Sequence, residues 1–564
     1  GNNNDWTSEG GLTESDVMLD SPTNNFCTLN PLAMGSGVTL SEGNLSSVSS
    51  SWQWAKSTYG VGSGKWYWEV NHLNGGADNL FCGISKESFT AFGYNLATAS
   101  AENYNVWGYT SNLGYKEGQN TYASYGAVFQ TAGDVVGVAL DMDAGTIAFY
   151  KNGASQGTAF SNVTGVVNPV WGGVNSSVSE GIMNFGADSS FAGNKTPQGN
   201  SDANGIGDFY YAPPSGFLAL CTANLPEPDV IPSENFNPVL YTGNQAANVA
   251  VTGVGFEPSL VWGKNRSSAS NHWLFDSVRG TTKMLQADQN NAEETQSGVT
   301  AFGSDGFTLG TWIGSTKTGD DYVAWNWKAE GSASTNTSGS IDSSVLANTA
   351  AGFSIASFTC PSGSGLYTVG HGLGAVPEFM IVKGRSATGN WHIYHKDVGN
   401  TKAYFLNNST AGFTSTGYWG DTTPTSTVFT QSIGGTLDVG TTAIGYFFNS
   451  VDGYSKVGSY TGNGSADGPF VHCGFRPAFV MVKRTDAGGG WHILDNKRAS
   501  PFNEIEVRIE ADNSDAENTG GPPDTDLVSN GFKLRTTFDN MNASGGTYIF
   551  LAFAESPFKN SNAR

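Results

Sequence analysis

The sequence predicts an all-β protein built from several domains. Its 564 residues include 75 glycines and 33 phenylalanines, and no segment shows the Ala-, Leu-, Glu- and Lys-rich pattern that helices favour. Short apolar runs alternate instead with Gly-, Asn- and Asp-rich turns, as they do between strands. A pattern of Pro, Lys and Trp also recurs three times in the second half of the chain. These observations predict one β-domain followed by three tandem small β-modules, and the length, at roughly 150 residues per domain, also gives about four units.

The charge and the cysteines limit the classes of partner. The 27 basic and 49 acidic residues give a net charge of -22, which argues against nucleic acid and against anionic membrane surfaces. No apolar run is long enough to span a bilayer, so no membrane insertion is expected. The five cysteines never form a CxxC pair, which favours buried thiols over disulfides or a zinc site. They are Cys27, Cys82, Cys221, Cys360 and Cys473.

The first domain is expected over residues 25–225. Residues 1–24 form a polar, Gly- and Asn-rich linker without a signal peptide, which we expect to join a preceding part of a longer protein. Within 133–153, an apolar strand, an Asp/Gly turn and a return strand predict a β-hairpin with a second turn at its end. Residues 217–221 are expected to add a closing strand, and 226–234 to form a Pro-rich linker.

Three motifs of this domain resemble those of the SPRY domain in order and spacing. They are GKWYWEV at 64–70, GDVVGVALDMDAGTIAFYKNG at 133–153 and Pro-Val-Trp at 169–171. The resemblance covers roughly residues 25–190. It implies a concanavalin-like β-sandwich of two sheets that binds protein or glycan through loops at one rim, without catalysis.

The resemblance places variable binding loops between the signature strands, where Tyr104, Trp107 and Tyr109 lie. We expect these three residues to contact ligand, with core packing or an intersubunit contact as the alternative. Asp141 and Asp143 alternate in a turn and are candidate calcium ligands, but Asp before Gly is also ordinary turn chemistry. We therefore expect no calcium there.

A threefold repeat organises the rest of the chain. Each copy has a lysine six residues after a proline, and a tryptophan 14 or 15 residues after that proline. The copies predict modules at 235–330, 351–451 and 453–564, with a Ser/Thr/Gly linker at 331–350. The repeated residues are Pro258, Pro377 and Pro477; Lys264, Lys383 and Lys483; Trp273, Trp391 and Trp491; and the pairs Gly306-Phe307, Gly412-Phe413 and Gly531-Phe532.

The tryptophans are expected in the module cores, with exposed platforms for sugar rings as the alternative. Their neighbours His272, His392 and His492 are then expected to face outward and to contact ligand. His392 and His395, with His371 nearby, lack ligand spacing, so we expect no metal. The acidic segment 510–526 is a weaker calcium candidate that we expect to face solvent. No cofactor is expected.

No catalytic motif stands out. The sequence lacks a recognisable pair of positioned carboxylates, a GxSxG elbow and a GxxxxGK[ST] loop, so we expect a protein that is not an enzyme. Two non-enzymatic functions remain open, a binding protein and a structural spacer.

The modules, the Asn-rich joint, the SPRY-like unit and the segment FYYAPPSGFLALCTANLPEP at 209–228 resemble tail-fibre-like and other virion structural proteins of tailed bacteriophages, particularly marine ones. This resemblance implies a location on the virion, contacts with other virion proteins and host attachment through a surface glycan or protein. It also implies a homotrimer, since slender β-modules gain by packing side by side. The alternatives are a capsid decoration or structural fibre without receptor binding, and a tailspike-type polysaccharide depolymerase.

Overall fold

The computed structural model describes the chain except for residues 1–18, 20, 22–23, 51–52, 75–79, 88, 90–91, 93–104, 174–177, 363–364, 416, 433–436, 438–439, 499–502, 504, 520–524 and 561–564. The all-β prediction is confirmed. The expectation of four compact units is wrong, because the chain divides into two, Gly1–Pro226 and Glu227–Arg564. Among the described residues no helix is long and apolar enough to cross a membrane.

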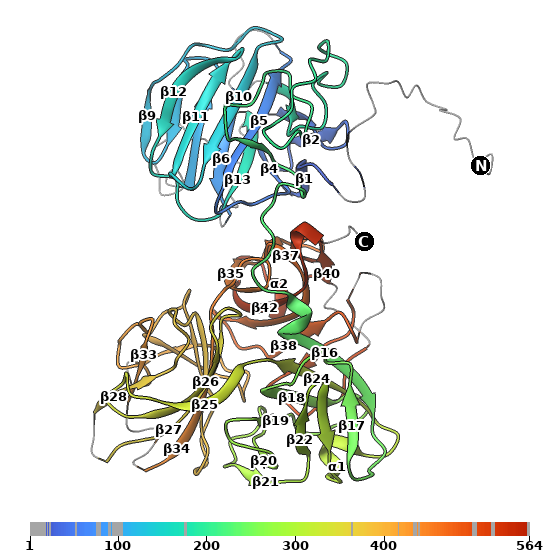
Figure 1. Ribbon diagram of the computed structural model, residues 1–564, viewed down its shortest axis with the longest axis vertical. Helices are drawn as coiled ribbons and strands as arrows, with labels where there is room; N and C mark the ends of the chain where they lie inside the picture. The colour runs from blue at the N-terminus through green and yellow to red at the C-terminus, as the bar shows by residue number, and fades with distance from the viewer. Residues whose placement is uncertain are drawn as a thin grey trace, which may run out of the picture. The chain divides into compact units, whose positions relative to one another are not determined.

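The first unit is a sandwich of two antiparallel sheets (Figure 1). One sheet runs in the order β1 (Leu29–Met34), β4 (Trp54–Ser57), β13 (Val167–Gly173), β6 (Leu80–Lys86), β7 (Val106–Thr110), β8 (Tyr115–Gly118) and β9 (Thr121–Ser124). The other runs in the order β12 (Ala154–Phe160), β11 (Thr146–Lys151), β10 (Val135–Asp141), β5 (Lys65–His72), β14 (Val178–Asn184), β3 (Ser46–Ser50) and β2 (Val38–Ser41). The predicted hairpin is β10 and β11, and its second turn uses Asn152 and Gly153 at positive φ of 48° and 80°.

A buried carboxylate helps to hold the segment after residue 187 on this sandwich. Glu69 accepts hydrogen bonds from the backbone N–H groups of Tyr210 and Tyr211 at 2.8 and 2.7 Å. Burial raises the pKa of Glu69 to about 7, although these donors favour the charged form. The predicted closing strand is confirmed as β15 (Leu218–Ala219), which pairs parallel to β5.

The second unit contains three antiparallel sheets, of four, eight and five strands, that share one order of four strands. In each, the first strand of the module pairs with the last, which pairs with the strand that carries the repeated lysine. These strands are β16 (Phe236–Thr242), β24 (Asp321–Trp327), β18 (Leu260–Asn265) and β19 (Trp273–Asp276); β27 (Phe353–Thr359), β34 (Thr442–Phe448), β29 (Phe379–Gly384) and β30 (His392–His395); and β35 (Ser455–Thr461), β42 (Thr547–Pro557), β37 (Phe475–Arg484) and β38 (Trp491–Asp495).

Smaller elements complete each module. The first has β17 (Val249–Thr252), β20 (Lys283–Met284), β21 (Glu294–Thr295), β22 (Val299–Gly303), β23 (Gly306–Leu309), α1 (Ile313–Thr316) and the 3-10 turn Pro232–Glu234; the second has β28 (Leu366–Gly370), β31 (Lys402–Phe405), β32 (Phe413–Thr414) and β33 (Val428–Ser432); the third has β36 (Phe470–His472), β39 (Ile509–Glu510), β40 (Thr525–Val528), β41 (Gly531–Leu534), α2 (Asp539–Asn542) and the 3-10 turn Phe558–Asn560. The linker expected at 331–350 is instead largely a hairpin of β25 (Glu330–Asn336) and β26 (Ser343–Asn348), which extends the second sheet because β26 pairs with β27.

The three sheets enclose one shared hydrophobic core, and each module also has a core of its own on the other side of its sheet. At its centre the rings of Trp327, Phe448 and Phe553, one from each closing strand, lie 5.6 to 6.3 Å apart by centroid. All three are at most 2% exposed. Each sheet therefore buries one face against the other two modules, which explains why the modules form one compact unit.

The register corrects the expected position of Trp273. Trp273 pairs with Gly263, the residue directly before the repeated lysine of the first module. In the other two modules the residue before the lysine pairs with His392 and His492. Trp273 thus matches the two histidines, and His272 matches Trp391 and Trp491. The first module has His before Trp, whereas the other two have Trp before His. Because successive strand residues face opposite sides, this exchange puts His272 on the face that Trp391 and Trp491 occupy.

The register also corrects the second Gly-Phe pair. Phe307 pairs with Val251, Phe532 with Val471 and Phe429 with Val369, in the corresponding small sheets. Phe429 is therefore the counterpart in the second module, and Gly412-Phe413 is not.

The three module boundaries repeat the same contacts in a cycle. Each repeated lysine is buried and donates a hydrogen bond to a backbone carbonyl of a neighbouring module. Lys264 reaches Ser514 at 3.3 Å, Lys383 reaches Asn290 at 3.4 Å, and Lys483 reaches Ser409 at 3.2 Å. The first module thus contacts the third, the second contacts the first, and the third contacts the second.

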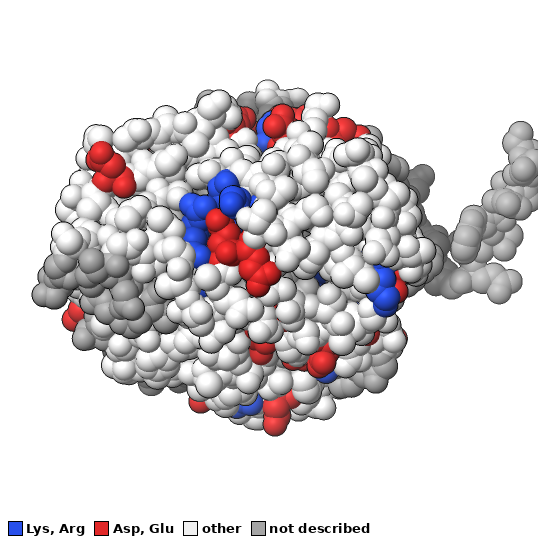
Figure 2. Space-filling view, turned by 90° about the horizontal axis from the view of Figure 1, so that it is seen from below, with Lys and Arg blue, Asp and Glu red and all other residues white. Residues whose placement is uncertain are grey.

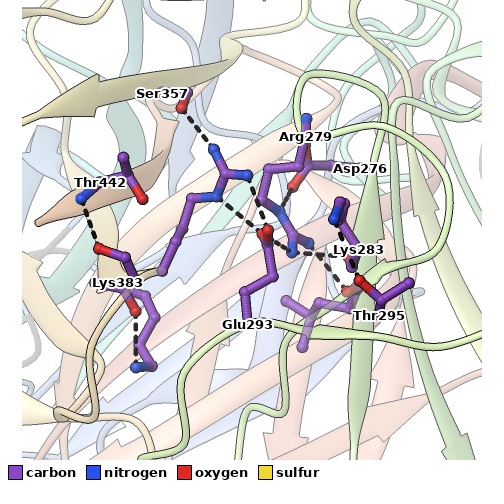
Figure 3. Close-up of polar contacts among 12 residues, drawn as sticks. Asp276, Arg279, Lys283, Glu293, Thr295, Ser357, Lys383 and Thr442 are labelled. Atoms are coloured by element: carbon purple, nitrogen blue, oxygen red, sulfur yellow. Dashed lines mark hydrogen bonds and ion pairs between the residues drawn. The ribbon is translucent and has the colours of Figure 1, made fainter.

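Two of these boundaries also contain a buried network of ion pairs (Figure 3). Glu293 of the first module accepts two hydrogen bonds from Arg385 of the second, at 2.8 and 2.9 Å, and pairs with Arg279, which pairs with Asp276. The boundary between the first and third modules has the same arrangement in Arg266, Glu517, Arg498 and Asp495.

The boundary between the second and third modules lacks this network. By register, Thr485 lies at the position of Arg385. Val398 and His395 lie at the positions of Arg279 and Asp276. His395 donates through Nε2 to the carbonyl of Phe550 at 3.4 Å, since its Nδ1 accepts from the backbone N–H of Asp397. One boundary of the three therefore has no charge at these positions.

We expect Glu293→Gln to lower the free energy of unfolding of the second unit by about 3 kcal/mol, because Arg279 and Arg385 then lose the negative charge with which both pair. Chemical denaturation of the full chain measures this. Thr485→Ala, at the matching position of Arg385 in the uncharged boundary, is the control and should change stability by less than about 1 kcal/mol. Equal losses in the two variants would contradict a special role for the network.

We expect the second unit to lose stability in acid. Burial lowers the pKa of five of its histidines: to about 4 in His371 and His395, to about 3 in His392 and His492, and well below the usual value in His272. The unfolded chain takes up these protons near pH 6.5 while the folded chain does not, so the free energy of unfolding falls as the pH drops from about 6.5 to about 4.

Each histidine contributes at most about 1.4 kcal/mol per pH unit to this loss. The urea midpoint should therefore decrease steadily between pH 7 and 5. His492→Asn, which removes one titrating group, should make the dependence shallower. A midpoint independent of pH over this range would show that the prediction is wrong.

Candidate functional site

The aromatic residues expected to bind ligand in the first unit belong to its core. Trp107 and Tyr109 lie on β7 and are 1% and 0% exposed, so their expected place in a loop is wrong. Tyr109 packs against Phe129 and Phe149 at 4.7 and 5.3 Å. Tyr104 lies outside the described residues. The sequence Val-Trp-Gly-Tyr-Thr alternates large side chains with glycine, and this alternation was the available signal of a strand.

The three histidines expected to face outward are also buried, at 0 to 2% exposure. His272 lies at a module boundary, where its Nε2 donates to the carbonyl of Glu510 at 3.0 Å and its Nδ1 accepts from Trp262. His392 and His492 lie inside their own modules. The expectation of outward histidines is wrong because each sheet is covered on both faces, by its own module and by the shared core.

The carboxylates considered for calcium have structural partners. Asp141 pairs with Lys65 at 2.8 Å, and Asp143 accepts from the backbone N–H of Gly64 at 2.8 Å. In the acidic segment of the third module, Glu517 lies in the boundary network and Asp512 accepts from the backbone N–H of Trp491. Over the described part of the chain, no group of three or more His, Cys, Asp and Glu side chains is placed to hold a metal.

The outer face of the first sheet offers a better candidate site. A cross-strand row starts at Val170 and passes through Gly83 and Gly108 to Glu117 and Tyr122. Residues paired across strands share a face, and this row lies opposite the core-facing Tyr109. The ring of Phe81 fills the space above Gly108 and Val170 is buried, so only the end of the row with Tyr122 reaches the surface.

Glu117 is the unusual member of this row. It is 1% exposed, its Oε1 has no hydrogen-bonding partner among the described residues, and burial raises its pKa to about 7. Beside it, Tyr115 and Tyr122 pack edge to face at 4.9 Å, and Tyr122 is 47% exposed. The exposed ring of Tyr122 therefore offers an aromatic surface to a ligand, with the buried polar group of Glu117 beside it.

Two further exposed apolar side chains flank the β8–β9 hairpin in the chain. Leu113 and Val128, at either end of it, are 47% and 44% exposed, in addition to Tyr122. Exposed apolar groups that lie together mark interaction sites more often than isolated ones do. Glu117 and Tyr122 were missed in the sequence because a short Tyr-Lys-Glu-Gly strand gives no binding motif.

The model of a domain of unknown function, DUF7483, matches residues 231–557, which is more than half of the chain. The chain belongs to the DUF7483 family. The match coincides with the second compact unit, which we call the DUF7483 unit from here on. The SPRY model matches residues 65–187, so the first unit is a SPRY domain, as its motifs indicated.

Known proteins resemble the SPRY part. The ATP-dependent RNA helicase DDX1 of Xenopus laevis is 26% identical over 258 residues, which cover 44% of this chain and 30% of the helicase. The SPRY domain of human HERC1 is 20% identical with a TM-score of 0.24, over 28% of this chain and 97% of that one. The TRIM65 PSpry domain is 15% identical with a TM-score of 0.23, over 28% and 92%.

We expect Trp107→Ala to destabilise the SPRY domain by about 3 to 5 kcal/mol, because it removes a fully buried indole. Tyr122→Ala should leave its stability within about 1 kcal/mol, since the ring is half exposed. Denaturant unfolding followed by near-ultraviolet circular dichroism measures both. A well-folded Trp107→Ala protein would contradict the core position of this residue.

Proposed function

We propose that this protein is a non-enzymatic structural and adhesion protein of a phage virion that binds a host surface glycan or protein through its SPRY domain. The observation that carries the proposal is the outer row of the first sheet, where Tyr122 is exposed beside the buried Glu117. The resemblance of the sequence to tail-fibre-like virion proteins, which covers almost the whole chain, is the reason for placing it on the virion.

The surface supports adhesion rather than binding of nucleic acid. Figure 2 shows a face on which basic and acidic side chains lie in small mixed groups on an otherwise uncharged surface. With a net charge of -22, such a surface favours neutral or protein ligands over polyanions. A virion carries many copies, so that weak single sites gain avidity of about 10²- to 10⁴-fold when linked.

A polysaccharide depolymerase is the less favoured alternative on chemical grounds. Glycoside hydrolysis normally uses two carboxyl groups on either side of the scissile bond, and the described outer row supplies one, that of Glu117. A capsid decoration without receptor binding remains the competing function. It predicts that no cell surface binds the purified protein.

We expect Tyr122→Ala to weaken adsorption of the labelled full chain to a panel of marine bacterial isolates by about tenfold, the equivalent of about 1.4 kcal/mol. Val178→Ala removes a similarly exposed side chain, 51% exposed, on β14 of the other sheet, and should bind like the wild type.

Three outcomes would decide the matter. A wild type that adsorbs to none of the isolates rejects the adhesive function in favour of the structural one. Equal adsorption of Tyr122→Ala and wild type rejects this site. Release of reducing sugar from isolate polysaccharide would reject the non-enzymatic assignment.

A further inference from the structure

The second module of the DUF7483 unit has a cluster of three aromatic rings at its surface. Phe405 on β31, Phe413 on β32 and the nearby Tyr418 have ring centroids 5.5 to 6.0 Å apart. Phe413 is 38% exposed, and the other two are half-buried. His392 lies beneath, with its ring 4.6 Å from that of Tyr418. Three hydrophobic rings thus meet at the surface above a buried histidine.

The sister modules place carboxylates at two of these positions. Phe405 pairs with His392, and the matching partner of His492 in the third module is Glu510. Phe413 pairs with Ala403 in the second module. At the matching position of the first module, Glu294 pairs with Met284. The matching backbone thus accepts a charged side chain at either position.

The size and surroundings of the cluster indicate what binds there. Three rings are far smaller than the surface of about 800 Å² per partner that a stable protein interface buries. The three rings carry one hydroxyl, that of Tyr418, and among the described residues their ring contacts are with His392 and with one another, without a charged side chain. Aromatic faces beside a hydroxyl suit the apolar face and the hydroxyls of a sugar ring.

We propose that Phe405, Phe413 and Tyr418 form a binding site for neutral hexose units of a polysaccharide, in the second module of the DUF7483 unit. The net charge of -22 disfavours an acidic polymer. His392, which the sequence marked as a ligand contact, is a positioning residue under Tyr418. The proposal rests on the adhesive function for its biological purpose, but the site is separate from that of the SPRY domain.

The decisive variant is Phe413→Glu, which introduces the residue found at the matching position of the first module. The probe is an array of neutral hexose polysaccharides and oligosaccharides, incubated with the labelled full chain. We expect binding to at least one of them, and a loss of at least tenfold in Phe413→Glu with an unchanged unfolding midpoint. Val376→Ala, which alters a 45% exposed side chain in the loop before β29 of the same module, is the matched control and should bind as the wild type does.

Two results would overturn the proposal. The first is the absence of binding to any neutral glycan, including the case in which only acidic glycans or proteins bind. The second is equal glycan binding by Phe413→Glu and wild type. Tyr122→Ala separates this site from the SPRY site, because it should retain the glycan binding that Phe413→Glu loses, even where cell adsorption through the SPRY domain fails.

Discussion

The DUF7483 unit depends on the burial of one face of each of its three sheets in a common core. A small sheet with one side in water buries too little apolar surface to be stable alone, and a second covered face changes that balance. The rings of Trp327, Phe448 and Phe553 meet at the point where the closing strands converge. Side-by-side packing, the reason to expect a homotrimer, is thus supplied within one chain.

The polar groups at the boundaries follow from this arrangement. A lysine buried between modules needs oxygen partners, and backbone carbonyls of the neighbouring loop provide them in all three boundaries. The Arg–Glu networks add bidentate geometry at two boundaries, which fixes the orientation of the modules more than it adds stability. At the third boundary Val398 and His395 replace the charged residues, so the repeats are similar but not interchangeable.

The divergence of the modules also gives them different surfaces. The positions that hold Glu294 and Glu510 in the first and third modules carry phenylalanines in the second. Repeats permit such divergence because two copies suffice to preserve the contacts while the third acquires a new surface. In the SPRY domain the two faces of one strand, β7, differ instead. Trp107 and Tyr109 face the core, and Gly108 lies in the outer row.

The sequence by itself determined the all-β class, the SPRY domain and the spacing of the repeated lysines, because these depend on local alternation, on turn residues such as Asn152-Gly153 and on a repeated pattern. Only the tertiary structure decided that the three modules form one unit, and that His272 rather than Trp273 lies at a boundary. Those outcomes depend on contacts between distant segments, such as Lys264 with Ser514, 250 residues apart. A shift of one residue exchanges the two faces of a strand, and local sequence does not specify which face the rest of the chain covers.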